Sequence, residues 1–149
     1  MATIICNGCF DLLHDGHVRF LRAARKLGGS ELDVIPPGLW HWNHLIVAIN
    51  SDDSARKLKA AKWGAKYPID SAHVRAQKLK DYADQVLIFD TEENLHEMIW
   101  FVSPCIIVKG PDYAGREKKV TGYDIAPVLI LDTPETEAIR EFKRQAYML

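Results

Sequence analysis

The sequence predicts an α/β fold built on a doubly wound parallel sheet. Short, continuously apolar runs recur along the chain, and such runs are typical of strands that are buried on both faces of a parallel sheet. Segments with helical periodicity separate these runs, as the strand–helix–strand units of such a sheet require. The length of 149 residues agrees with this prediction, because it is enough to bury a sizeable core.

The apolar runs and the helical patterns alternate along the chain. The runs that we interpret as strands are residues 3–6, 85–90, 105–110 and 127–132. The helical patterns cover residues 18–27, 72–83 and 94–102. In the first helix, Val18, Leu21 and Ala24 share one face. Because ligands bind doubly wound sheets beyond the carboxyl ends of the strands, we expect the functional residues at that edge.

The composition is that of an ordinary globular protein, with 48% hydrophobic and 26% charged residues, and we expect one compact domain over residues 1–149. A net charge of −1 gives no electrostatic reason to expect nucleic-acid binding, and no apolar run is long enough to cross a membrane. The chain enters a strand almost at once, so we expect no signal peptide. Three cysteines fit a reducing cytoplasm.

The segment from residue 7 to residue 17 carries the strongest functional signal. Gly8 allows a sharp turn after the first strand, and Gly16 removes a side chain that would keep a phosphate away from the backbone. His14 and His17 lie three residues apart at a helix start, near unpaired backbone N–H groups. Two imidazoles placed there can donate hydrogen bonds to phosphoryl oxygens during an in-line displacement, and neither needs to act as a nucleophile. The segment therefore predicts a nucleotide site.

A zinc site is the alternative interpretation of the same segment. A Cys-x-x-Cys pair at Cys6 and Cys9 precedes the two histidines, and a further His-x-x-His pair begins at His41. Structural zinc sites with two Cys and two His usually separate the pairs by about a dozen residues, which is far more than the short gap in this segment. We therefore expect Cys6 in the core, and a zinc-binding interaction domain remains the weaker hypothesis.

Asn-Gly-Cys-Phe-Asp and His-Asp-Gly-His, within residues 7–28, resemble the opening of the cytidylyltransferase-like family of nucleotidyltransferases. That family is marked by His-x-Gly-His after the first strand of a Rossmann-like sheet. Within it the chain is most similar to adenylyltransferases that act on D-glycero-D-manno-heptose 1-phosphate, with glycerol-3-phosphate cytidylyltransferase as a relative of different specificity. Residues 45–52 resemble the second strand. Residues 106–113 resemble the fourth strand and its Lys-Gly-Gly-Asp-Tyr segment, in which Pro111 replaces the second glycine.

The resemblance implies a reaction in which a nucleoside triphosphate and a sugar phosphate give a nucleotide sugar and pyrophosphate. It implies ATP as the nucleotide, Mg²⁺ carried by that nucleotide rather than by protein ligands, a small phosphorylated acceptor, and a homodimer. Two alternatives stay open. One is a CTP-dependent cytidylyltransferase acting on glycerol 3-phosphate or another alditol phosphate, and the other is a nucleotide-binding module with little or no turnover.

The resemblance also assigns roles to residues. His14 and His17 hold the transferred phosphoryl group, and Lys59 neutralises the departing pyrophosphate together with either Arg56 or Lys57. Without the resemblance, the basic run at residues 54–62 would be interpreted as a solvated helix face. The further residues that we expect to bind the nucleotide or the acceptor are Asn7, Gly8, Cys9, Phe10, Asp11, Gly16, Lys57, Arg75, Lys109, Gly110, Asp112 and Thr136.

Two segments depart from the family pattern. Residues 29–43 form an insertion with a Pro-Pro-Gly turn, which we expect at the amino-terminal side of the sheet as a neutral loop or, if functional, as a dimer contact rather than a lid. Near the C-terminus, Thr133, Pro134 and Glu135 replace much of a Ser-Thr-Thr-like turn. We expect Thr133 to cap the last helix, Pro134 to start it, and Glu135 to repel phosphate where a hydroxyl usually meets it.

Overall fold

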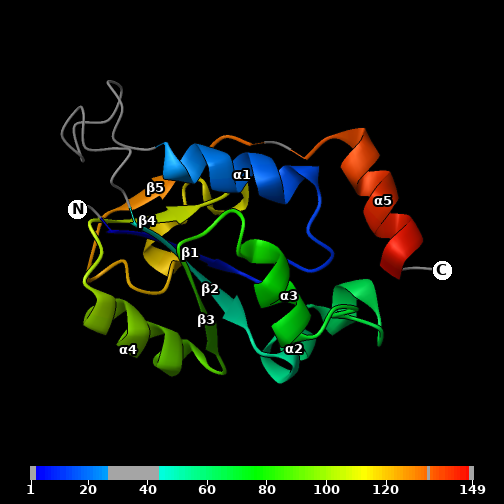
Figure 1. Ribbon diagram of the computed structural model, residues 1–149, viewed down its shortest axis with the longest axis horizontal. Coiled ribbons are helices and arrows are strands. Elements are labelled where there is room, and N and C mark those ends of the chain that lie inside the picture. The colour runs from blue at the N-terminus through cyan, green and yellow to red at the C-terminus, as the bar shows by residue number, and fades with distance from the viewer. Residues whose placement is uncertain (1–2, 27–43, 134, 148–149) are drawn as a thin grey trace.

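The computed structural model describes residues 3–26, 44–133 and 135–147. Its centre is a five-stranded sheet in which every neighbouring pair of strands runs parallel. The strand order is β3-β2-β1-β4-β5, so the chain moves outward on one side of β1 and then returns to its other side at β4 (Figure 1). The predicted doubly wound parallel sheet is thus confirmed. The strands are β1 (Thr3–Gly8), β2 (His44–Asn50), β3 (Gln85–Phe89), β4 (Ile106–Lys109) and β5 (Val128–Ile130).

Helices follow the strands as the sequence pattern predicts, although their ends differ. The predicted first helix begins three residues earlier, at Asp15, because His14 caps it. The helix predicted over residues 94–102 begins at Glu92, since the Thr91 side chain accepts a hydrogen bond from the Asn94 N–H. The helices of the described residues are α1 (Asp15–Arg25), α2 (Asp52–Trp63), α3 (Ala72–Leu79), α4 (Glu92–Val102) and α5 (Glu137–Tyr147), with 3₁₀ turns η2 (Pro111–Tyr113) and η3 (Glu117–Lys119).

The hydrophobic core lies on both faces of the sheet, because successive residues of β1 point to opposite sides. Ile4 and Cys6 pack in one cluster with Leu21 of α1. Ile5 packs in a second cluster with Leu95 of α4. Figure 1 shows α1 and α4 on opposite sides of the sheet. Each fully buried aliphatic side chain of these clusters contributes about 1.5–3 kcal/mol to the stability of the fold.

A third cluster lies at the carboxyl edge of the sheet and anchors α5. The Tyr147 ring packs against Tyr67 and Trp63, with centroid distances of 5.1 and 5.2 Å. Burial and the neighbouring Asp11 carboxylate raise the pKa of Tyr147, so its hydroxyl stays protonated and hydrogen-bonds to Asp11. The end of α5 is therefore tied both to α2 and to the loop after β1.

The predicted insertion at residues 29–43 lies outside the described residues, so its expected loop conformation and its dimer contact stay predictions. Within the described ranges, no helix has the length and apolar character needed to span a membrane.

Candidate active site

The two histidines cap α1 in a reciprocal arrangement. His14 is the residue before the helix, and its Nδ1 accepts hydrogen bonds from the backbone N–H groups of Gly16 and His17, at 3.1 and 3.4 Å. In return, Nδ1 of His17 accepts from the backbone N–H of His14 at 3.3 Å. This is the geometry of a capping box, with imidazoles in place of the usual hydroxyl and carboxylate. The helix start thus fixes both rings.

The capping bonds determine where each ring carries its proton. A neutral imidazole has one donor and one acceptor nitrogen, and Nδ1 is the acceptor in both His14 and His17. Both rings therefore carry hydrogen on Nε2. The rings stack with centroids 3.7 Å apart and an interplanar angle of 17°. Nε2 of His14 is buried and has no hydrogen-bond partner among the described residues, so its donor hydrogen is unsatisfied.

Burial keeps both histidines neutral. For His14, burial and then the positive charge of Lys143 lower the pKa to about 4. For His17, burial, the adjacent His14 and the charges of Lys143 and Lys59 hold the pKa well below its ordinary value. Both rings are therefore uncharged N–H donors near pH 7, and neither acts as a general acid or base there.

Packing requires a glycine at position 16. A Cβ at this position would lie 2.9 Å from Cδ1 of Ile139 and 3.0 Å from the His14 ring. The space that the absent side chain leaves is therefore occupied by α5. Gly8 is similarly close to a ring, because a Cβ there would lie 3.1 Å from Phe10. These two glycines let the loop after β1 and α5 approach the histidines.

Lys109 lies where the strand order reverses between β1 and β4. Its Nζ donates a hydrogen bond to the backbone oxygen of Asn7 at 3.1 Å and lies 4.5 Å from the centre of the Tyr113 ring. Burial lowers its pKa to about 8, so it is mostly charged at pH 7. The structure thus brings the predicted residues Asn7 and Lys109 together.

Two other predicted basic residues lie on α2. Lys59 is half-buried, and its charge lowers the pKa of both His17 and Lys109, which places it near both. Lys57 is exposed. Arg56 is exposed too and pairs with Asp53 at 2.7 Å. Of this group, Lys59 lies best for a phosphate bound at the histidines.

Three residues of the loop after β1 make contacts that hold this loop beside the histidines. The Phe10 ring lies 5.1 Å from the His17 ring, and its backbone has a φ of 51°. The buried Asp11 carboxylate accepts hydrogen bonds from the backbone N–H groups of Ile69 and Asp70, both at 2.9 Å. The thiol of Cys9 donates to Asn50. We therefore assign these predicted binding residues to holding the loop rather than to direct ligand contact.

Arg75 has a different task from the predicted nucleotide contact. It is 1% exposed, and its guanidinium donates to the backbone oxygens of Cys9, Asn50 and Asp70. A fourth bond, at 2.9 Å, goes to the Asp52 carboxylate. With its nitrogens engaged inside the protein, Arg75 joins the loop after β1 to the carboxyl end of β2.

The segment after β4 forms an exposed rim. Pro111, which replaces the second glycine of the family's segment, begins the 3₁₀ turn η2. Asp112 is exposed within that turn. A Cβ on Gly110 would meet no atom within 4 Å, which leaves open space beside the end of β4. The predicted residues Gly110 and Asp112 thus lie at the edge of the site.

The predicted start of α5 is wrong. Thr136, and not Thr133, accepts the capping hydrogen bond, from the Ile139 N–H at 3.3 Å. The helix begins at Glu137, because the Thr136 side chain satisfies the N–H of the third helical residue. Pro134, the predicted first helical residue, lies outside the described residues.

Glu135 also differs from the bare carboxylate that the sequence predicts. Its Oε1 lies 2.5 Å from Nζ of Lys143, and Oε2 lies 3.9 Å from Nε of Arg140. Burial alone would raise its pKa, but the bond and charge of Lys143 and the charge of Arg140 hold the pKa below its usual value. Two cations of α5 therefore compensate the negative charge of Glu135.

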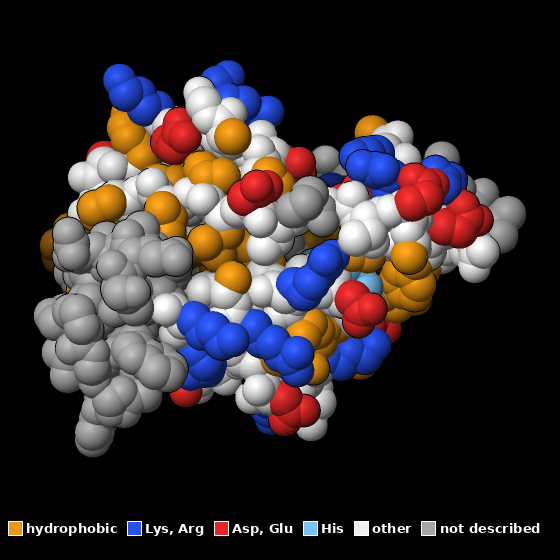
Figure 2. All heavy atoms as spheres, turned by 90° about the horizontal axis from the view of Figure 1, so that it is seen from above, with side chains coloured by type: hydrophobic (Ala, Val, Ile, Leu, Met, Phe, Trp, Pro, Cys, Tyr) orange, Lys and Arg blue, Asp and Glu red, His pale blue; other side chains and the backbone are white. Residues whose placement is uncertain are grey.

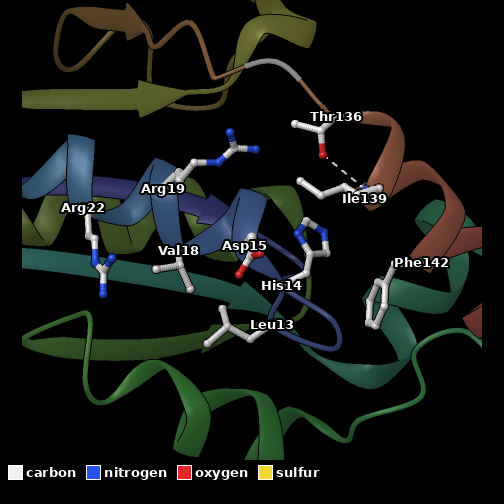
Figure 3. A pocket seen from close by; sticks show the side chains of 10 residues that line it. Leu13, His14, Asp15, Val18, Arg19, Arg22, Thr136, Ile139 and Phe142 are labelled. Atoms are coloured by element: carbon white, nitrogen blue, oxygen red, sulfur yellow. Dashed lines mark hydrogen bonds between the residues drawn. The ribbon is translucent and has the colours of Figure 1, made fainter.

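A cavity of about 700 Å³ opens between α1 and α5. Figure 3 shows His14 and Thr136 in its wall, with the Thr136 hydroxyl directed at the start of α5. Arg19 lines the cavity from α1, and the Phe142 ring from α5 lies edge-on to His14 with centroids 6.0 Å apart. In Figure 2, a small histidine surface shows among hydrophobic and charged side chains on this side of the molecule.

The residues that sequence analysis missed come from α5. Ile139, Phe142 and Lys143 all approach the histidines, yet no local motif contains them. The sequence signal that could have identified them is the spacing of apolar residues along α5, which shows the face of the helix that packs inward.

The two cysteines of the zinc hypothesis belong to different clusters. Cys6 is fully buried in the core beneath α1, whereas Cys9 packs with Tyr67 and Tyr147 at the carboxyl edge. Across residues 3–26, 44–133 and 135–147, no three His, Cys, Asp or Glu side chains are grouped to hold a metal.

Comparison with known sequences shows the family of this chain. The profile of the Cytidylyltransferase-like family matches residues 5–122, and the chain belongs to that family. Two relatives, each called Bifunctional protein HldE, give more detail. The one from a Nitratiruptor species is 42% identical over 147 residues, which cover 95% of this chain and 27% of the relative. The one from Campylobacter curvus is 41% identical over 143 residues, which cover 92% and 26%.

The chain thus spans about a quarter of the length of these relatives. Among solved structures, the crystal structure of a protein with unknown function from Archaeoglobus fulgidus matches with a TM-score of 0.57 and 17% identity. It covers 92% of this chain and 95% of its own chain. Similarity at that identity supports the fold alone.

We expect Arg75→Met to lower the free energy of unfolding by about 3 kcal/mol. The change leaves buried carbonyl oxygens unpaired and removes the cationic partner of Asp52. Urea denaturation measures the loss, with Arg56→Met as the control, since Arg56 is an exposed arginine paired on its own helix. Unchanged stability together with weakened nucleotide binding would restore the original prediction for Arg75.

We expect acid to destabilise the fold partly through His14. An unfolded histidine binds a proton near pH 6.5, whereas folded His14 resists it until about pH 4. Below pH 6.5 the unfolded state therefore binds more protons, and stability falls as the pH decreases from about 6.5 to 4. His14→Asn keeps a helix cap but does not titrate, so it should recover about 1 kcal/mol of this loss, the half-exposed ring being screened by solvent.

Chemical denaturation of both proteins at pH 7, 5.5 and 4.5 measures this difference. Identical pH slopes for wild type and His14→Asn would show that the ring is not held neutral by its surroundings.

Proposed function

We propose that this chain is a nucleotidyltransferase domain that transfers a nucleoside monophosphate from a nucleoside triphosphate to a sugar phosphate and releases pyrophosphate. The observation that supports this most is the pair of neutral Nε2–H donors, of which that of His14 is buried and unpartnered among the described residues. The pair lies at a helix start beside the point where the strand order reverses. Such a place suits a phosphoryl group that gains negative charge.

The chemistry is an in-line displacement. An oxygen of the acceptor phosphate gives an electron pair to the α-phosphorus, and the bond from that phosphorus to the bridging oxygen breaks as pyrophosphate leaves. His14 and His17 donate hydrogen bonds to the oxygens that gain charge. Their lowered pKa keeps both rings neutral, and a neutral imidazole does not release its remaining N–H proton near pH 7. Lys59 and Lys109 neutralise the polyphosphate. The attacking oxygen is already ionised, so no side chain has to remove a proton.

Mg²⁺ would be held by the phosphate oxygens of the nucleotide. Two carboxylates near the histidines are engaged within the protein, since Asp11 accepts from two backbone N–H groups and Glu135 pairs with Lys143. The third, Asp15, is exposed and lines the cavity beside His14. A single carboxylate is too few ligands for a metal held by the protein alone. When bound with the nucleotide, the ion would withdraw charge from the phosphates.

The resemblance to heptose 1-phosphate adenylyltransferases favours ATP and a sugar 1-phosphate as the substrates. Glycerol 3-phosphate or another alditol phosphate with CTP is the alternative pair within the same family. A nucleotide-binding module with little turnover is the second candidate, and Glu135, in place of the expected hydroxyl, is the observation that favours it.

We expect His14→Asn to lower turnover by about 10²–10³-fold. Asn still accepts the capping hydrogen bonds but offers no Nε2–H donor, and one donor to a developing charge is worth about 3–4 kcal/mol. Pyrophosphate release with a panel of nucleoside triphosphates and sugar phosphates measures the effect, and the melting temperature confirms that the fold is retained. Turnover equal to wild type would contradict the proposed role of the histidines, and no release by wild type with any pair would favour the binding module.

We also expect Mg²⁺-ATP to raise the melting temperature more than Mg²⁺-CTP at equal concentration. A ligand stabilises the folded state according to its affinity, and a tenfold difference in Kd is worth about 1.4 kcal/mol when both ligands are well above Kd. Thermal shift measurements decide the order. A larger shift with CTP would transfer the assignment to a cytidylyltransferase.

A further inference from the structure

The inner face of α5 contains one lysine between two buried residues. Ile139, Lys143 and Tyr147 follow one another at intervals of four and so lie on the same side of the helix. Ile139 and Tyr147 are 5% and 6% exposed, and the Lys143 side chain keeps only 26% of its exposure. Because both neighbours are fixed by packing, the base of the Lys143 side chain is held toward the interior.

The packing of α5 directs this lysine toward the histidines. Cδ1 of Ile139 fills the space above Gly16, and the Phe142 ring lies against His14. The Lys143 ammonium is near enough that its charge lowers the pKa of both His14 and His17. It also lies 5.6 Å from the centre of the Trp63 ring on α2. Lys143 therefore lies between α2 and the start of α1. Lys59, on α2, lies near His17 as well.

The ammonium of Lys143 is held by one carboxylate. Its Nζ lies 2.5 Å from Oε1 of Glu135, the residue in the position where the family pattern has a hydroxyl. Arg140 is a second cation for the same carboxylate, at 3.9 Å. If Lys143 moved away, Glu135 would keep Arg140 of α5 as a positive neighbour.

We propose that Lys143 binds the polyphosphate of the nucleotide, and that Glu135 holds its ammonium in place until the nucleotide arrives. This inference rests on the proposed function and adds a phosphate-binding residue to it. A lysine has a flexible stem, so its ammonium can pass from one anion to another while α5 stays packed. A polyphosphate carries several negative charges against the single charge of Glu135. Once released from Glu135, Lys143 thus supplies a positive charge beside the altered turn.

Isothermal titration of the full chain with Mg²⁺-free sodium tripolyphosphate tests the proposal. Lys143→Met keeps most of the side-chain volume and removes the charge, and the Kd should rise about tenfold, as for the loss of one charge-assisted hydrogen bond. Lys143→Arg should restore most of the affinity. Arg144→Met is the matched control, because Arg144 lies on the outer side of α5 and pairs with Glu137 and Glu141. Its Kd should stay within twofold of wild type.

Glu135→Gln gives a result of opposite sign. Removing the competing carboxylate should lower the Kd for tripolyphosphate about threefold, and this variant tests the proposal even where Lys143→Met fails to fold. Equal Kd values for wild type and a folded Lys143→Met variant would overturn the inference. Weaker binding by Glu135→Gln would overturn it as well.

Pyrophosphate release by the wild-type chain separates this inference from the proposed function. Turnover by wild type, with tripolyphosphate binding unaffected by Lys143→Met, would overturn the role of Lys143 alone. If the wild-type chain showed no turnover and did not bind tripolyphosphate, both the proposed function and the role of Lys143 would be overturned.

Discussion

The buried guanidinium of Arg75 is the interaction on which the carboxyl edge of the sheet depends. It binds backbone oxygens from the loop after β1 and from the end of β2, together with the Asp52 carboxylate. The partners lie 66, 25 and 23 residues from Arg75 along the chain. Asp11 makes the complementary connection, since its carboxylate accepts from two backbone N–H groups just before α3. A cation and an anion thus join the same segments from two sides, and the histidine loop is held between them.

On this frame, one set of hydrogen bonds gives the histidines both structure and chemistry. The capping bonds at Nδ1 satisfy backbone donors at the start of α1 and also direct the ring hydrogens to Nε2. Burial then lowers the pKa of His14 to about 4 and holds the pKa of His17 well below its ordinary value, so the donors stay neutral. Such donors can stabilise charge on a phosphoryl group without exchanging a proton with it. The requirements of the helix cap and of the proposed reaction are the same.

Sequence could predict the parts of this molecule that depend on local pattern. Buried parallel strands are continuously apolar, so the sheet was predictable, and the spacing of His14 and His17 indicated a shared face. The task of Arg75 could not be predicted, because its burial follows from contacts with residues far away along the chain. The start of α5 was misplaced for a related reason. Thr133 and Thr136 both resemble caps, and packing against α1 decides which one serves.

The departure near the C-terminus changes the chemistry of the site without opening it. Ile139 holds one end of α5 over Gly16, while Tyr147 holds the other end against Tyr67 and Trp63. Neither contact involves the residues that differ from the family pattern. The position of α5 therefore does not depend on the altered residues, and Lys143 is the counter-ion of Glu135. A hydroxyl that donates one hydrogen bond is replaced by a charged pair that can separate, so the altered turn is compatible with phosphate binding as long as the lysine remains.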